Sequence, residues 1–108
     1  MKVDSLFKGS LCDASAEAQR LESLSYDGMM SYETEHDPFF PLLLAAGETE
    51  RIDLMTTIAV AFARTPMNLA HIGHDLNSYS RGRLILGLGS QIKPHITRRF
   101  SMPWSSPA

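Results

Sequence analysis

The chain has 108 residues, of which 44% are hydrophobic and 20% are charged, proportions that are ordinary for a soluble globular protein. This length predicts a single domain spanning residues 1–108. Twelve acidic and ten basic residues give a formal charge of −2, which argues against a general nucleic-acid binder. The only cysteine, Cys12, excludes an intrachain disulfide and indicates a reducing compartment, which we expect to be the cytoplasm. No signal peptide is recognisable, and the apolar runs fall short of the roughly 20 residues that a membrane helix needs.

The first half of the chain alternates between strand and helix patterns. Residues 2–7 predict a short strand, and residues 14–24 predict a helix whose inward residues are Ala14, Ala18 and Leu21. Residues 29–32 predict a second strand, followed by a loop over 33–37. Asp37 and Pro38 form a cap and first-turn pair that predicts the start of a second helix. Because residues 42–46 are all Leu or Ala, we expect that helix to be covered nearly all round.

The stretch from 52 to 91 predicts a strand, a helix and a second strand. Residues 52–61 are rich in β-branched and apolar residues and contain no Gly or Pro. Thr65-Pro66 then predicts a helix start. The apolar stripe of this helix recurs at 3.6-residue spacing and consists of Leu69, Ile72, Leu76 and Tyr79. Gly82 suits the left-handed residue after the helix, and residues 83–90 predict an apolar strand.

This β-α-β-α-β-α-β order, with a further helix beginning over 95–100, predicts an α/β fold with about four parallel strands and three to four helices. In such folds, ligands lie at the carboxyl ends of the strands. A closed parallel barrel has eight strands, and an open sheet of four leaves two unpaired edges. We therefore expect the N-terminal half of a TIM-like (β/α)8 barrel, which pairs with a second copy or with a missing C-terminal half.

Two motifs resemble the bacterial luciferase-like monooxygenase superfamily. They are the segment 56–66, TTIAVAFARTP, and the segment 80–90, SRGRLILGLGS, in the family's order and spacing. The segments 33–41, ETEHDPFFP, and 89–95, GSQIKPH, look most like the branch that uses the deazaflavin coenzyme F-420. The resemblance covers nearly the whole chain but only the N-terminal third or so of a family member.

The resemblance implies a flavin- or deazaflavin-dependent oxidoreductase that transfers hydride to or from a small organic substrate. Coenzyme F-420 is the expected cofactor, with FMN as the alternative. The resemblance also implies a non-prolyl cis peptide at Thr57–Ile58 behind the ring. The residues expected to line the cofactor are Thr57, Ile58, Ala59, Gly89, Ser90 and Gln91. Where the deazaflavin branch often carries an acid, this chain has Gln91, which cannot supply a proton by titration.

Glu33 and His36 follow the second predicted strand and are the candidate catalytic residues, since a carboxylate can act as a base and an imidazole can shuttle a proton. The alternative is a solvated loop that caps the next helix. For Gly87 and Gly89, the alternative to close approach by a ligand is tight packing at a strand end. His71 and His74 lie three apart without the third ligand or the glutamate of a zinc motif, so we expect no metal site.

Two rival functions stay open at this point. The chain could be a catalytically inactive half-barrel or assembly module that lacks the cofactor's phosphate-binding loops. It could also be an independent small α/β binding domain unrelated to flavins.

Overall fold

The computed structural model describes residues 2–34 and 36–89. Within them, four parallel strands form a sheet in the order β1-β2-β3-β5, and two more form a separate parallel pair, β4-β6. The strands are β1 (Asp4–Leu6), β2 (Gly28–Ser31), β3 (Asp53–Thr56), β4 (Ala59–Val60), β5 (Leu84–Ile85) and β6 (Leu88–Gly89). The helices are α1 (Ala14–Ser23), α2 (Phe39–Glu48) and α3 (Pro66–Tyr79), with short 3-10 turns η1 (Leu11–Asp13) and η2 (Ala61–Ala63).

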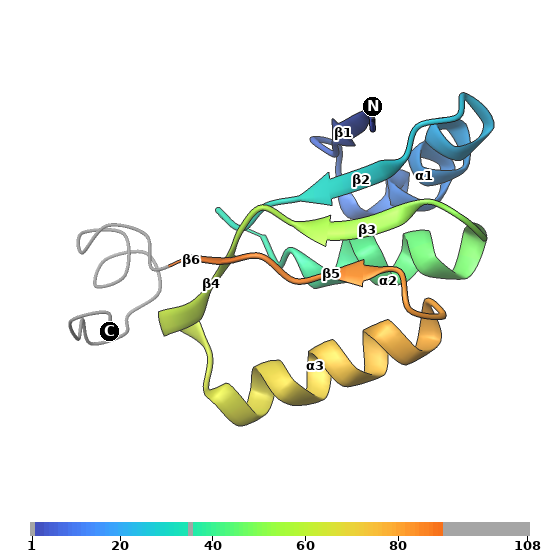
Figure 1. Ribbon diagram of the computed structural model, residues 1–108. Helices are drawn as coiled ribbons and strands as arrows, with labels where there is room; N and C mark the ends of the chain where they lie inside the picture. Colours follow the sequence, from blue (N-terminus) through green and yellow to red (C-terminus); the bar gives the residue numbers. More distant parts are fainter. Residues whose placement is uncertain (1, 35, 90–108) are drawn as a thin grey trace.

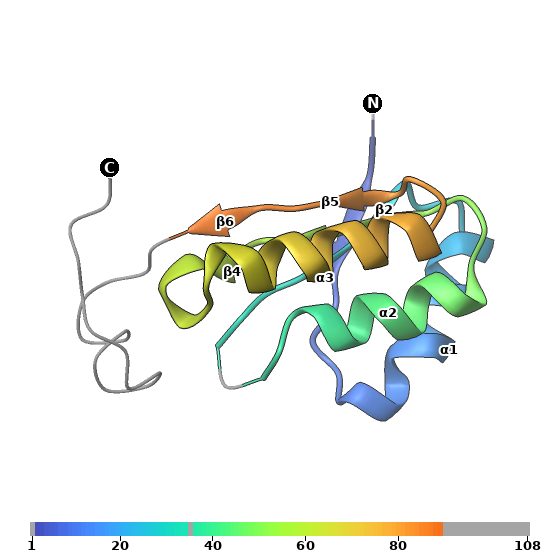
Figure 2. The same ribbon diagram turned by 90° about the horizontal axis from the view of Figure 1, so that it is seen from below.

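All three α-helices lie on one face of the four-stranded sheet (Figures 1 and 2). Each of them connects one strand of this sheet to the parallel strand beside it, as the sequence pattern predicts. The α/β class with parallel strands is therefore confirmed. The helix predicted from residue 95 lies outside the described residues. Over the described residues, none of the helices has the length and apolar character that crossing a bilayer would take.

Helix boundaries follow from side-chain capping. Thr65 Oγ1 accepts a hydrogen bond from the Asn68 N–H at 3.1 Å, and Pro66 is the first residue of α3, as predicted. Asp37 Oδ1 accepts from the N–H groups of Phe39 at 2.6 Å and Phe40 at 3.1 Å, so α2 begins just beyond the predicted proline. At the far end of α3, Gly82 has φ +83°, the left-handed conformation that glycine adopts without a Cβ clash.

The core lies between the helices and the outer face of the sheet. Met29 of β2 and Leu54 of β3 are fully buried there, and Leu42 of α2 packs against them. The predicted inward residues of α1 are all buried. Fully burying a side chain such as Leu42 contributes about 1.5–3 kcal/mol, which is why these strands stay joined to their helices.

The inner face of the sheet carries an apolar row that none of the three described helices covers. Leu6, Met30, Met55 and Ile85 are neighbours in register across β1, β2, β3 and β5. Alternation along each strand turns them away from Met29 and Leu54. Leu6 is 36% exposed and Ile85 is 49% exposed. This row is the arrangement expected of the interior of a parallel barrel.

Three expectations need correction. The predicted strand 52–61 is two strands, β3 and β4, because the chain turns out of the main sheet after Thr56; the predicted strand 83–90 is likewise divided into β5 and β6. Tyr79 belongs to the predicted apolar stripe of α3 but is 58% exposed, since it stands in the last turn beyond the core. Helix α2 is not covered all round, because Phe40 and Leu43 lie on its outer side, 57% and 44% exposed.

Arg83, just before β5, joins the ends of two helices. Its guanidinium donates to the carbonyl oxygens of Ala46, Thr49 and Ile52 and to the Thr49 hydroxyl, at 2.8 to 3.1 Å. Its Nε donates to the Ser80 carbonyl at 2.7 Å. One side chain thus satisfies the Ala46 carbonyl near the C-terminus of α2 and two carbonyl groups of the segment that follows the helix.

Candidate functional site

The candidate site is the backbone that follows β3, at the carboxyl ends of the strands. The peptide Thr57–Ile58 is cis, as the family resemblance implies. The Thr57 N–H donates to the Ser31 carbonyl of β2 at 2.7 Å, and the Ala59 N–H donates to the Gly87 carbonyl at 2.9 Å. We call residues 57–60 the β3–β4 bulge. It bridges β2 on one side and the β5–β6 segment on the other.

Gly87 and Gly89 pack directly against this bulge. A Cβ at Gly87 would lie 2.3 Å from the Thr56 carbonyl oxygen, and a Cβ at Gly89 would lie 1.8 Å from Ile58 Cδ1. The Thr56 hydroxyl also donates to the Gly87 carbonyl at 2.8 Å and accepts from the Gly87 N–H at 2.9 Å. The space left by each missing side chain is thus occupied by protein atoms, which favours the packing explanation of these glycines over direct ligand approach.

The four predicted cofactor-lining residues that the structure describes lie together but differ in accessibility. Thr57 is exposed, Ile58 and Gly89 are half-buried, and Ala59 is fully buried within the core. The Ala59 side chain can therefore shape the site but cannot touch a ligand. Two further predicted residues, Ser90 and Gln91, lie outside the described residues.

Glu33 is buried, and its carboxylate is fully engaged with protein groups. It is 6% exposed; Oε1 accepts from Arg64 Nη1 and, at 2.7 Å, from the Val60 N–H, while Oε2 accepts from Arg64 Nη2 at 2.8 Å. Burial lowers the pKa of Arg64, but its hydrogen bonds and charge pairing with Glu33 and Asp37 outweigh this and raise it, so its charge is permanent. Glu33's predicted catalytic role stays a prediction, and these contacts favour a positioning role.

His36 lies in a different environment from Glu33. It is exposed and lines a depression of about 630 Å³ between the loop after β1 and the start of α2. Phe7 and Phe40 supply apolar lining, and Lys8 of the loop after β1 lines it as well. This depression is at the carboxyl ends of β1 and β2, the end at which parallel barrels bind ligands, so the catalytic role expected of His36 stays a prediction.

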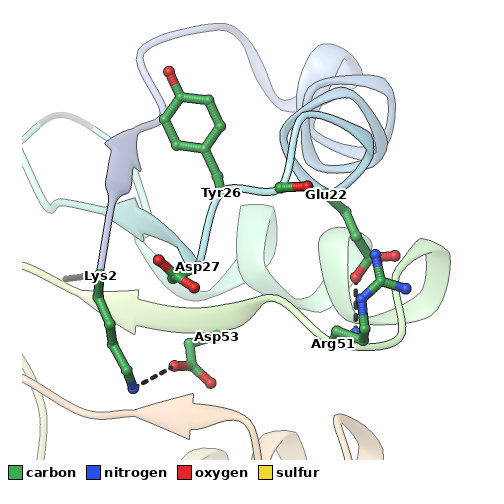
Figure 3. A pocket seen from close by; sticks show the side chains of 7 residues that line it. Lys2, Glu22, Tyr26, Asp27, Arg51 and Asp53 are labelled. Atoms are coloured by element: carbon green, nitrogen blue, oxygen red, sulfur yellow. Dashed lines mark hydrogen bonds and ion pairs between the residues drawn. The ribbon is translucent and has the colours of Figure 1, made fainter.

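A second depression, of about 320 Å³, lies at the opposite, amino-terminal end of the strands (Figure 3). Several of its charged side chains already have partners. Lys2 pairs with Asp53 at 3.7 Å, Asp27 accepts from the Val3 N–H at 2.7 Å, and Glu22 accepts from the Arg51 N–H at 2.7 Å. In parallel barrels this end serves stability rather than chemistry, so we do not take it as the active site.

Arg64 is the site residue that sequence reasoning missed, although it stands inside the motif before Thr65-Pro66. It contacts Glu33, Asp37 and the face of Phe39, whose ring centroid is 5.0 Å from the guanidinium carbon. The available signal was a lone basic residue between an apolar run and a helix cap, together with two acids in the loop after the preceding strand.

Comparison with known proteins agrees with this fold. The profile of the family described as luciferase-like monooxygenase matches residues 4–108. The uncharacterized proteins Mb1395 of Mycobacterium bovis and Rv1360 of Mycobacterium tuberculosis are 56% identical over all 108 residues, which make up 32% of each relative. The chain thus spans about a third of the length of the curated relatives it matches.

Solved structures share the fold at low sequence identity. The FMN-bound oxygenating constituent of 3,6-diketocamphane monooxygenase from Pseudomonas putida matches with a TM-score of 0.82 at 20% identity, over 93% of this chain and 32% of that one. The coenzyme F420-dependent tetrahydromethanopterin reductase of Methanopyrus kandleri matches with a TM-score of 0.78 at 21% identity, over 96% of this chain and 30% of that one. At these identities, the matches establish the fold alone.

Proposed function

We propose that this chain, which belongs to the luciferase-like monooxygenase family, forms the N-terminal part of an oxidoreductase. The proposed reaction is hydride transfer to or from a small organic substrate. The proposed cofactor is coenzyme F-420, with FMN as the alternative. The cofactor supplies the redox chemistry when bound, and the protein positions it.

The observation that carries this proposal is the convergence of β2, the β3–β4 bulge and β6 at one end of the sheet. Thr57 and Ile58 present an accessible, mainly uncharged surface there, which suits a flat aromatic ring. The solved relatives include one described with FMN and one described as coenzyme F420-dependent. The resemblance of segments 33–41 and 89–95 to the branch that uses coenzyme F-420 is the reason for proposing the deazaflavin first, while Gln91 departs from the acid that this branch often carries.

The residues proposed to act on the substrate are those that line the depression beside α2. His36 would donate a hydrogen bond or move a proton, and Lys8 would attract a negatively charged group. Arg64 is not available as an anchor for a cofactor phosphate, because Glu33 and Asp37 hold its guanidinium. Phosphate contacts would therefore come from Lys8 or from segments outside the described residues.

The test is a fluorescence titration of the purified protein with coenzyme F-420 and, separately, with FMN. Binding tighter than millimolar, with His36→Ala leaving affinity unchanged but reducing turnover, supports the proposal. If a folded sample binds neither cofactor, the proposed function is wrong.

A second candidate is a half-barrel that serves as an assembly module. The exposed inner row, which includes Leu6 and Ile85, favours it, because apolar side chains in register across four strands form a surface that a second set of strands would cover. A homo-oligomer or a pairing with the remaining strands of a barrel would provide that cover. Mass measurement in solution distinguishes a monomer from a dimer, and a monomer without cofactor binding argues against both candidates.

A further inference from the structure

Glu33 and Arg64 form a buried ion pair directly behind the β3–β4 bulge. Their side chains are 6% and 10% exposed, and two parallel hydrogen bonds join them. Charges removed from water are costly, and replacing such a pair with apolar residues is often neutral or stabilising. Stability alone is therefore a weak explanation for this pair, and its geometric effect is the better one.

That geometric effect falls on the bulge. The Glu33 carboxylate accepts from the Val60 N–H at 2.7 Å, and the Glu33 N–H donates to the Ile58 carbonyl at 3.1 Å. The Glu33 residue thus holds both ends of the segment 58–60 from the side of β2. On the other side, the Ala59 N–H is held by the Gly87 carbonyl.

Arg64 connects the ion pair to the start of α2 in the helical layer. Its Nη2 donates to Asp37 at 3.2 Å, and its guanidinium stacks over the Phe39 ring. Asp37 in turn caps the first turn of α2. The bulge, the end of β2 and the start of α2 are therefore linked through one guanidinium that cannot rotate without breaking several contacts.

We propose that Glu33 and Arg64 are positioning residues, which set the height and orientation of the β3–β4 bulge on which the cofactor ring rests. This inference rests on the proposed function. It reassigns Glu33 from proton transfer to support, because both of its carboxylate oxygens already accept hydrogen bonds and its side chain barely reaches solvent. Thr57 and Ile58 make the contact with the ring, and Glu33 acts through them.

Glu33→Gln tests the proposal, and Glu22→Gln is a matched control. Glu22 is also a carboxylate that accepts from backbone N–H groups, those of residues 50–52, but it lies at the opposite end of the sheet. Both variants should lower the melting temperature. Only Glu33→Gln should weaken cofactor binding, by about tenfold or more, and shift the absorption band of the bound ring, because small misplacements at a site have large effects. Arg64→Lys, which cannot donate two parallel bonds, should behave as Glu33→Gln does.

Backbone amide exchange provides a readout that needs no cofactor. Protection of the Val60 amide should fall in Glu33→Gln and stay unchanged in Glu22→Gln, which should instead lose protection at residues 50–52. If the folded Glu33→Gln variant keeps wild-type protection at Val60, or keeps wild-type affinity and spectrum, the positioning role is refuted. If the wild-type protein binds neither cofactor, the proposed function fails separately, and the exchange result alone decides whether the pair supports the bulge.

Discussion

Replacing Gly87 with alanine tests how tightly the β3–β4 bulge is packed. The added Cβ would lie 2.3 Å from the Thr56 carbonyl oxygen, which is a backbone atom and cannot rotate away. Relief requires β3 and the β5–β6 segment to separate locally. Overpacking of this kind costs about 1–3 kcal/mol. Weakening the two hydrogen bonds between the Thr56 hydroxyl and Gly87 adds up to about 1 kcal/mol each.

Two other glycines calibrate the result. At Gly89 the obstacle is Ile58 Cδ1, the end of a flexible side chain, so Gly89→Ala should cost only about 1 kcal/mol for a displaced rotamer. At Gly73, inside α3, the nearest atom is Leu86 Cδ2 at 3.9 Å, so Gly73→Ala should stabilise by about 0.5–1 kcal/mol.

Urea unfolding followed by circular dichroism measures all three variants under one set of conditions. From most to least stable, the expected order is Gly73→Ala, wild type, Gly89→Ala and Gly87→Ala. The free energy of unfolding of Gly87→Ala should be about 3 kcal/mol below that of the wild type. A Gly87→Ala variant within about 0.5 kcal/mol of wild type would refute the close packing of Thr56 and Gly87.

Three further predictions use the same unfolding assay. Leu42→Ala should cost about 2–5 kcal/mol because the side chain is fully buried, whereas the 44% exposed Leu43 should tolerate alanine within about 0.5 kcal/mol; equal effects would contradict the described core. Thr65→Ala should lose about 1 kcal/mol with the cap of α3, and Thr65→Ser should retain it. Burial raises the pKa of Glu22, but hydrogen bonds from the backbone N–H groups of residues 50–52 outweigh this effect and lower the pKa from 4.5. The ionised Glu22 carboxylate therefore contributes its full stabilisation of the fold above pH 4.5. This stabilisation is lost as the pH falls through the lower pKa of the folded state. Glu22→Gln should therefore flatten the acid limb of a stability–pH curve, and an unchanged limb would be contrary evidence.

Local signals in the sequence predicted the helices and most strand positions. Thr65-Pro66 and Gly82 fixed the limits of α3 because a cap and a left-handed residue act within one turn. The division of residues 52–61 could not be predicted from periodicity, because β4 pairs with β6 across nearly 30 residues of intervening chain. An apolar run gives no indication of where its strand leaves one sheet to join another.

The candidate site was predicted less completely than the fold. The cis peptide between Thr57 and Ile58, directly after β3, was predicted, since the family motif marks that position. The pairing of Glu33 with Arg64 was not predicted, because the two residues are 31 positions apart and each has ordinary surface-loop alternatives. Spatial partners of this kind depend on the turn after β3, which only the folded chain reveals.

The hydrogen bonds of Arg83 have a consequence for the order in which the molecule assembles. The carbonyl groups of Ala46 in α2 and of Thr49 just after it accept hydrogen bonds from Arg83, which follows Ala46 by 37 positions. As the polypeptide emerges from the ribosome, α1 and α2 are complete well before Arg83 is available, so the end of α2 frays in water until β5 docks beside β3. The C-terminal end of α2 therefore becomes fully ordered only after β5 has joined the sheet as its fourth strand. A nascent chain that stalls before Arg83 would expose the frayed end of α2 to proteases.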